Sequence, residues 1–285
     1  MRPLTSSSTI VIAMIAVGTS QYAAAGLIAY EPFDYSITDN SPNDNKDVDL
    51  ANNYPGATLN SSNMKWRSGS SNHGVVSGSL SYTDSGGRIL VTAGNKLSTL
   101  GGSNGSTSQG EFLNGINGNA INVNSGVIWV SAIMQHSSGS GEAVIMLQNG
   151  SSVDQSPFMG DARNNPVVWT LQGATPTSTA DATQVTFLLA RYDFDNDTAH
   201  LWVNPSLDAE PSLASALAAT NTFTSASVQR FRLSSDGNNS VLWDELRFGT
   251  TFADVTPHVI PEPAMTGLLG LAAMGLKRRR RTCWA

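Results

Sequence analysis

The sequence predicts an all-β protein, built as an antiparallel β-sandwich. Short runs rich in Val, Ile, Leu, Thr and aromatic residues are separated by Gly, Ser, Asn and Asp. Several runs alternate apolar and polar residues, as strands with one buried face do. The charged fraction is only 13%, about half the ~25% usual for soluble domains. Two sheets that bury their apolar faces against each other would fill the core.

The expected strands, in chain order, are residues 27–30, 75–82, 88–92, 127–134, 143–148, 167–172, 183–192, 199–203, 228–233 and 241–248. In one of them, Phe231 and Leu233 share one face while Arg230 and Arg232 share the other. A single short helix is expected, at residues 213–219. The stretches expected to be long surface loops are rich in Gly, Ser and Asn, and they are residues 59–73 and 100–124. Residues 26–257 form one sandwich domain in this interpretation.

Residues 1–25 have the three parts of a secretory signal peptide. Arg2 provides the positive charge, residues 10–17 are apolar, and residues 23–25 are three alanines suited to cleavage. The apolar part is too short to span a bilayer. The sequence therefore predicts export through the secretion translocon and removal of the segment by signal peptidase, which leaves a mature chain that starts near Gly26.

The C-terminal stretch combines a short motif, an apolar span and a basic cluster. Residues 258–263 are expected to be a linker, in which Pro261 and Pro263 keep the backbone extended. Residues 264–276 are apolar or small and would form a helix of about 20 Å, shorter than the ~30 Å hydrocarbon core. The basic residues after them would stay on the cytoplasmic side. The segment 264–285 thus predicts a weak, transient transmembrane anchor.

This order of parts resembles the PEP-CTERM protein-sorting signal. The resemblance implies that an exosortase, a membrane cysteine transpeptidase, recognises the motif and removes the segment beyond it. The protein would be held at the inner membrane transiently and then delivered to the cell surface or the extracellular matrix. A short C-terminal anchor without processing is the alternative. The residues that carry the signal are Pro261, Glu262, Pro263, Arg278, Arg279, Arg280 and Arg281.

Three stretches of the domain resemble concanavalin A-like, LamG-type jelly rolls. They are residues 29–35 (AYEPFDY), residues 76–82 (VSGSLSY) and residues 243–255 (WDELRFGTTFADV). The resemblance implies a jelly-roll fold and carries no activity.

Charge and cysteine content exclude several function classes. The chain has 16 Lys and Arg against 22 Asp and Glu. Five of the basic residues, Lys277 to Arg281, lie in the C-terminal tail, so the domain itself is strongly acidic. Nucleic acid is therefore excluded as a partner, because phosphate binding needs a basic face. Cys283 is the only cysteine and lies in the segment that would be removed. The mature chain would have no disulfide, thiol nucleophile or cysteine-ligated metal.

A glycoside hydrolase or lyase of concanavalin A-like fold is the main enzymatic alternative. Laminarinase-like enzymes carry Glu-x-Asp-x-x-Glu on one strand face, and this spacing is missing here. Asp244 and Glu245 are adjacent, so they are expected to point to opposite faces. The Gly-x-Ser-x-Gly match at residues 101–105 lies in low-complexity sequence. We therefore expect no catalytic residues and no enzymatic activity.

An acidic stretch offers the one candidate metal site. Asp193, Asp195 and Asp197 could bind Ca²⁺ through their oxygens, and a Ca-dependent adhesion or structural protein is an alternative function. However, Thr198 occupies the position where a calcium loop needs glycine. The stretch also lies between two expected strands, where an Asp-rich turn is the favoured interpretation. No other cofactor is expected.

Aromatic residues suggest a carbohydrate-binding face. Trp202, His200 and Asn204 share one side of an expected strand, and Trp66 lies in an expected loop. Indole rings can stack on sugars while polar neighbours bind hydroxyl groups. Trp169 and Trp243 are expected in the core instead. The sequence thus predicts an exported, non-catalytic protein that binds glycan, with exopolysaccharide as partner, or that serves as a structural matrix component.

Overall fold

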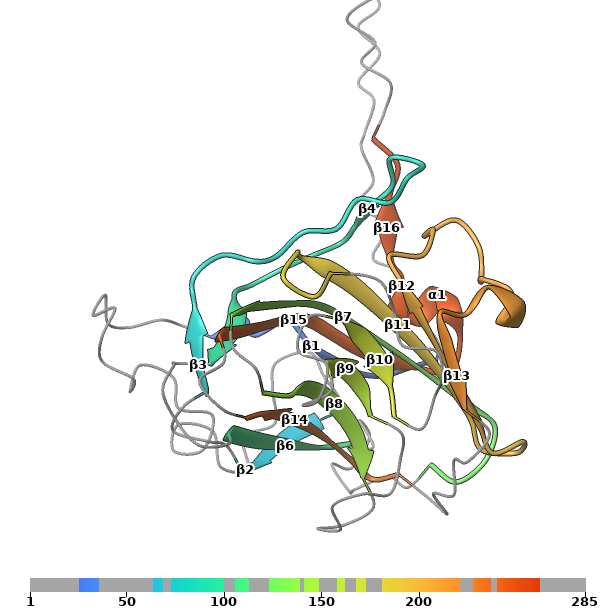
Figure 1. The fold of residues 1–285 in the computed structure, drawn as a ribbon, viewed down its shortest axis with the longest axis horizontal. Coiled ribbons are helices and arrows are strands. Elements are labelled where there is room, and N and C mark those ends of the chain that lie inside the picture. Colours follow the sequence, from blue (N-terminus) through green and yellow to red (C-terminus); the bar gives the residue numbers. More distant parts are fainter. Residues whose placement is uncertain are drawn as a thin grey trace, which may run out of the picture.

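The computed structural model describes residues 26–35, 64–68, 73–99, 106–112, 123–138, 141–148, 158–161, 168–172, 181–220, 228–236 and 240–261. These residues form two antiparallel sheets stacked face to face (Figure 1), which confirms the predicted β-sandwich. The predicted signal peptide and the predicted C-terminal helix with its basic tail lie outside the described residues. Among the residues described, no helix has the length and apolar character needed to cross a membrane.

The larger sheet has the order β13-β12-β11-β7-β15-β5-β3, and β1 pairs with β15 as well. Its strands are β1 (Leu27–Glu31), β3 (His73–Val76), β5 (Lys96–Thr99), β7 (Val127–Ser138), β11 (Thr186–Asp193), β12 (Thr198–Val203), β13 (Ala218–Thr220) and β15 (Ser240–Gly249).

The smaller sheet has the order β10-β9-β8-β14-β6-β2. Its strands are β2 (Met64–Ser68), β6 (Ser106–Phe112), β8 (Ala143–Gln148), β9 (Met159–Asp161), β10 (Trp169–Leu171) and β14 (Arg230–Ser235). A separate pair joins β4 (Ile89–Leu90) to β16 (His258–Val259). The helical elements of the described part are the 3₁₀ turn η1 (Leu213–Ser215) and the helix α1 (Phe252–Val255).

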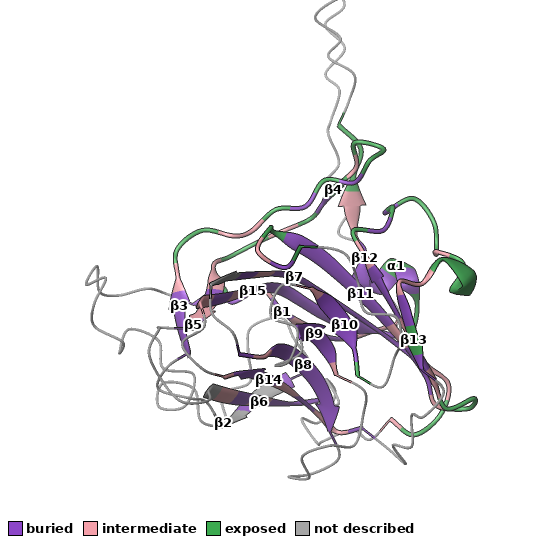
Figure 2. Cartoon of the chain, viewed as in Figure 1, coloured by how far each residue is buried: buried purple, intermediate pink, exposed green. Residues whose placement is uncertain are grey.

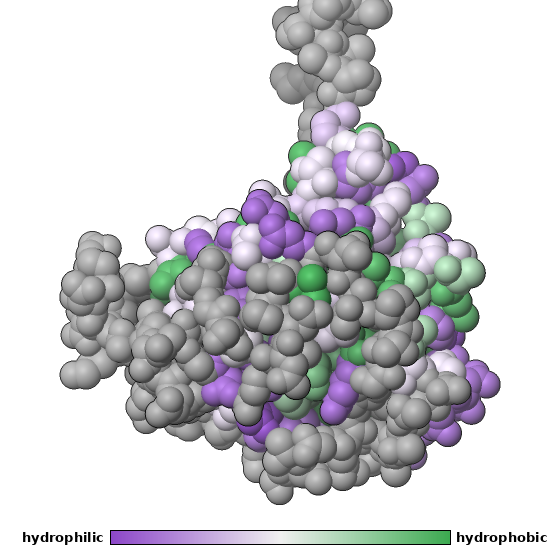
Figure 3. All heavy atoms as spheres, viewed as in Figure 1, coloured by the Kyte–Doolittle hydropathy of each residue, from purple (hydrophilic) through white to green (hydrophobic). Residues whose placement is uncertain are grey.

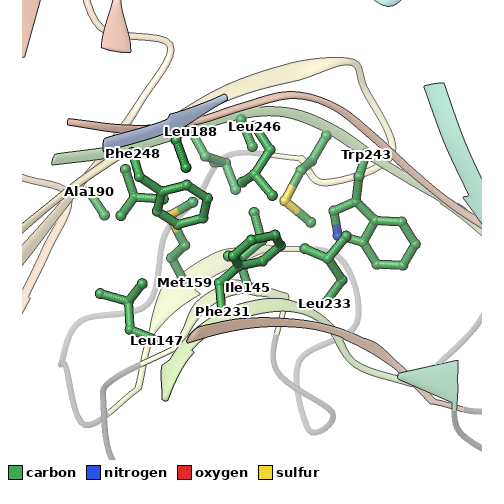
Figure 4. Packing of buried hydrophobic residues seen from close by; sticks show 14 of the residues in the cluster. Ile145, Leu147, Met159, Leu188, Ala190, Phe231, Leu233, Trp243, Leu246 and Phe248 are labelled. Carbon is green, nitrogen blue, oxygen red and sulfur yellow. The ribbon is translucent and has the colours of Figure 1, made fainter. Parts of the chain in front are cut away.

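The main core lies between the two sheets (Figure 4). From the larger sheet, Leu246 and Phe248 of β15 point toward the smaller sheet, where Phe231 and Leu233 of β14 meet them. The predicted core positions Trp169 and Trp243 are fully buried here, which confirms that interpretation. Burial of these side chains supplies most of the driving force for stacking the sheets.

A second apolar cluster covers the outer face of the larger sheet. Trp129, Phe187 and Trp202 face away from the main core and pack under loop residues, among them Tyr82 and Leu207. Strand β11 is consequently buried on both faces along nearly its whole length (Figure 2). Residues 77–95, which we call the strap, form part of this cover.

Two predicted surface loops contain strands of the smaller sheet. Strands β2 and β6 lie within residues 59–73 and 100–124, so the loop prediction is wrong there. Gly110 of β6 pairs with Phe231 on one side and with Trp66 on the other, and those two rings meet edge to face at 5.4 Å. The small residues of β6 make room for the aromatic rings, and a segment rich in small polar residues is also typical of a loop.

Other predicted boundaries also change. The predicted helix at residues 213–219 is wrong, because η1 ends at Ser215 and β13 begins at Ala218. The predicted strand at residues 75–82 stops at Val76, since Gly78 adopts φ +80°. The linker predicted at residues 258–263 starts later, because His258–Val259 is strand β16 and pairs with β4.

The first resemblance stretch, residues 29–35, forms a buried hub at the edge of the core. Glu31 accepts hydrogen bonds from the Phe33 backbone (2.7 Å), the Tyr35 hydroxyl (2.6 Å) and the Trp66 indole (2.9 Å). Burial nevertheless raises the pKa of Glu31 to about 7. This carboxyl joins β1 to β2, and so connects the two sheets.

Replacement of Gly110 by alanine should destabilise the sandwich. The added Cβ would lie 2.3 Å from the ring of Phe231, so the rings over β6 must move. Overpacking of this kind costs about 1–3 kcal/mol, and each kcal/mol lowers the Tm of a domain this size by roughly 2–4 °C. Gly86→Ala is the control, because its Cβ meets mainly the far end of the Arg88 side chain. Equal melting of both variants and the native chain would contradict this packing.

Glu31→Gln should flatten the pH dependence of stability. The pKa of Glu31 rises from 4.5 to about 7 on folding, so the folded chain binds more protons between these values. Its stabilising contribution is therefore complete below pH 4.5 and is lost as the pH rises to 7. The deficit of the variant, measured by thermal unfolding, should shrink over this range. A constant deficit would contradict the assignment, and Glu210→Gln on the surface is the control.

Candidate binding site

An open pocket of about 450 Å³ lies at the end of β12. Its floor and walls are mostly apolar, and three polar side chains reach it, namely Asn204, Ser206 and Ser215. The lining residues are Trp202, Val203, Asn204, Pro205, Ser206, Pro211, Ser215 and Leu217. Two residues of the predicted glycan-contact set, Trp202 and Asn204, thus line one pocket.

The polar groups of the pocket differ in availability. Asn204 adopts φ 50° at the end of β12, and its Oδ1 accepts the Phe187 N–H at 2.9 Å. Within the described part of the chain, the Asn204 Nδ2 group has no partner. Ser206 is exposed and donates to Asp84 at 3.2 Å. An apolar wall with a few amide and hydroxyl groups is suited to a sugar or another small polyhydroxylated ligand.

Trp202 does not offer an open ring face. The residue is 3% exposed, and its ring stacks on Trp129 at 5.6 Å and on His200 at 6.0 Å. Its indole N–H is donated to Ser215 Oγ at 3.2 Å and to the Ser212 carbonyl at 3.3 Å. Stacking of a sugar on Trp202, as the sequence predicts, is therefore blocked, although Trp202 is one of the residues that line the pocket.

The other two predicted glycan contacts lie elsewhere. His200 is half-buried beside Trp202 but does not line the pocket. Trp66 is fully buried in the main core, where it donates to Glu31 and to Tyr35. The prediction that Trp66 lies in an exposed loop is wrong, since it lies on strand β2 and has no surface to present to a sugar.

The predicted calcium residues form the hairpin turn between β11 and β12. Asp193 accepts from the backbone of Asn196 at 3.1 Å, and its Oδ2 lies 3.0 Å from Arg191. Although burial opposes ionisation, the bonds from Asn196 and Arg191 hold the pKa of Asp193 below its ordinary value. Asp195 and Asp197 are exposed, and Asp195 accepts the Gly126 N–H at 3.0 Å.

In the residues the structure describes, no group of three or more His, Cys, Asp or Glu side chains is arranged to hold a metal ion. The carboxylate of Asp193 already has a guanidinium and an amide as partners, so it is poorly available as a ligand for a cation.

The acidic pair Asp244 and Glu245 lies in a β-bulge of β15. The register with β7 shifts between Asp244 and Arg247, and Glu245 adopts φ 53°. Trp243 and Leu246 still point into the main core, while both carboxylates point out toward the strap. The prediction that they face opposite sides is therefore wrong, because a bulge adds one residue and breaks the alternation.

Both carboxylates of the bulge hold the strap against the sheet. Asp244 accepts from Ser79 Oγ at 2.7 Å and from the Leu80 N–H at 2.5 Å. Glu245 accepts from the Ala93 N–H at 2.5 Å and from the Tyr30 hydroxyl at 2.8 Å, and it also pairs with Arg247. Both carboxylates are fully buried, and burial raises the pKa of Asp244 to about 7.

One end of the main core carries buried histidines for which the sequence gives no functional signal. His136 of β7 contacts Asp161 of β9 at 2.5 Å, and both are buried. His73 lies 2.7 Å from Ser108, and burial lowers the pKa of His73 to about 3. Because each pair joins strands of different sheets, residue spacing along the chain gives no indication of it.

Chelation of calcium should leave the stability of the protein unchanged. The hairpin is closed by Arg191 and Asn196, so we expect the same Tm in EGTA and in added Ca²⁺. Asp193→Asn should lower the Tm in both buffers, since it loses the ion pair and part of the turn's hydrogen bonding. A rise in Tm with Ca²⁺ that disappears in Asp195→Asn would instead establish a calcium site.

Known proteins resemble this chain distantly in structure, and one short sequence motif also matches. Curated proteins gave no match to the sequence. Among solved structures, the T. cruzi calreticulin globular domain is 9% identical with a TM-score of 0.41, and the match covers 73% of this chain and 90% of that chain. Peanut lectin is 12% identical with a TM-score of 0.35, covering 68% of this chain and 94% of that chain.

A glycoside hydrolase family 131 catalytic domain from Coprinopsis cinerea is 13% identical with a TM-score of 0.37, covering 65% of this chain and 82% of that chain. Each of these likenesses is distant, and the sandwich fold rests on the sheets described above.

The family model of the PEP-CTERM protein-sorting motif matches residues 259–281. This range contains every residue predicted for the sorting signal, from Pro261 to Arg281. The motif implies export to the cell surface and processing by an exosortase. The chain therefore carries a PEP-CTERM protein-sorting motif behind its β-sandwich, and it is an exported protein.

Proposed function

We propose that this exported sandwich is a non-catalytic cell-surface or matrix protein that binds glycan through the pocket at the end of β12. The observation that carries the proposal is the pocket itself, in which the Asn204 Nδ2 group and the Ser206 and Ser215 hydroxyls lie beside an apolar wall. Exopolysaccharide is the partner class that this chemistry and an extracellular location favour. A purely structural role in the matrix is the outcome if no glycan binds.

The buried acidic pair supports a non-catalytic role. Glycoside hydrolysis needs two carboxyl groups that flank a bond of the substrate. Asp244 and Glu245 lie under the strap, and their oxygens accept hydrogen bonds from it. A substrate could reach them only if residues 77–95 detached from the sheet. Both carboxylates therefore hold the strap on the sheet, which is a role in stability.

The same proposal includes a membrane stage before release. Residues 264–276 are apolar and short, and the basic residues after them would remain in the cytoplasm. This tail would hold the sandwich at the outer side of the inner membrane until an exosortase cuts near the Pro261–Pro263 motif.

The purified protein should be retained on exopolysaccharide from its host, and filling the pocket should abolish retention. Ser206→Tyr places a ring at the pocket, whereas Ala214→Tyr places one on the exposed η1 turn outside the pocket lining. We expect loss of retention for the first variant and native retention for the second. The flow-through is tested for new reducing ends, and none is expected.

Three results would overturn the proposal in different ways. Retention that survives Ser206→Tyr would remove the pocket as the glycan site. Absence of retention for the native protein would overturn glycan binding, and a structural role in the matrix would be the function that remains. New reducing ends that disappear in Asp244→Asn would establish an enzyme.

A further inference from the structure

Exposed aliphatic side chains gather where the sandwich meets the sorting motif. In the described part of the chain, six large hydrophobic residues are exposed, and four of them belong to the β4–β16 pair and its neighbours. They are Ile89 (37%), Val91 (41%), Val259 (52%) and Ile260 (70%). We call these four residues the tip. Figure 3 shows hydrophobic residues in this region, beside the grey atoms.

The tip is held in a defined position by backbone pairing. Val259 pairs with Ile89 and His258 with Leu90, and the Val91 N–H is donated to the Pro257 carbonyl at 2.8 Å. Leu90 is buried in the outer apolar cluster, so alternation turns Ile89 and Val91 away from the sandwich. Figure 1 shows β4 and β16 beyond the edge of the two sheets.

The chain length beyond the tip limits its distance from the membrane. Glu262 and Pro263 are the residues between Pro261 and the apolar segment at 264–276. Four residues of fully extended chain reach at most about 14 Å, which is the longest separation of Ile260 from Ala264. An inserted apolar segment therefore keeps the tip close enough to reach the headgroup layer.

The tip also lacks the charges that would oppose contact with lipid. Residues 89–93 and 255–261 contain no Asp, Glu, Lys or Arg. The nearest described cation along the chain is Arg88, which is paired with Asp84 and with Asp208. Contact of the tip with lipid would therefore remove water from no unpaired charged side chain among residues 88–93 and 255–261.

We propose that the tip is a membrane-contact surface that seats the sandwich on the lipid headgroup layer while the tail is inserted. Aliphatic side chains buried at the boundary between headgroups and acyl chains gain free energy in proportion to their area. The contact would hold the Pro261 end of the motif at the membrane plane, where a membrane enzyme can reach it. This inference rests on the membrane stage proposed above.

The experiment uses the full chain with vesicles of phosphatidylethanolamine and phosphatidylglycerol that carry nitroxide headgroups. A bimane label is placed at Ile89→Cys or, as control, at Leu213→Cys, both in a Cys283→Ser background. Leu213 is an aliphatic residue of similar exposure (47%) away from the tip. Flotation with the vesicles reports insertion of the tail, and quenching of bimane reports contact of the labelled site with headgroups.

We expect the chain to float and the label at residue 89 to be quenched several-fold more than the label at residue 213. The change Val91→Ser/Val259→Ser/Ile260→Ser should reduce that quenching, whereas Val185→Ser should not. Quenching that is insensitive to the triple change would mean that the tether alone places the tip, and it would overturn the proposal.

Two further outcomes separate this inference from the membrane stage. A chain that floats without quenching at residue 89 would overturn the lipid contact and leave the membrane stage intact, and a protein would then be the remaining occupant of the tip. A chain that does not float would overturn both.

Discussion

The pairing of β1 with β15 connects the two ends of the domain, and the bulge in β15 attaches the strap to the same strand. Glu31 of β1 joins the hub to the smaller sheet through Trp66, while Asp244 and Glu245 hold residues 79–93 on the outer face. Three buried carboxylates thus serve as acceptors for groups that would otherwise lack partners, and an unpartnered buried group costs about 1–3 kcal/mol.

The three stretches that resemble jelly-roll domains become one connected unit in the structure. Residues 29–35 form the hub, residues 76–82 begin the strap, and residues 243–255 supply the bulge and the capping box of α1. Tyr82 extends this unit by donating to the Pro205 carbonyl at 2.6 Å. Their contacts hold the two sheets and the strap together, which explains why these stretches predict a fold.

The sequence predicts most of the strands that have a distinct apolar pattern, such as residues 143–148, and fails where packing sets the composition. Gly110 is typical of a loop residue, yet it lies beneath two aromatic rings. Alternation also fails at Glu245, because one inserted residue turns its side chain to the same side as Asp244. The prediction that Trp202 lies on a strand is confirmed by β12, but the residue pattern cannot show that a second layer of loops covers that face.

That second layer also joins the pocket to the tip. Asp84 of the strap accepts from Leu207 and Ser206 at 2.8 and 3.2 Å, and Arg88 contacts Asp208 at 2.6 Å. Strand β16 ends at Val259, before Pro261, so a cut at or after the motif would leave its pairing with β4 in place. Removal of the tail would therefore leave the pocket unaltered, because no described contact of the pocket depends on residues beyond Pro261.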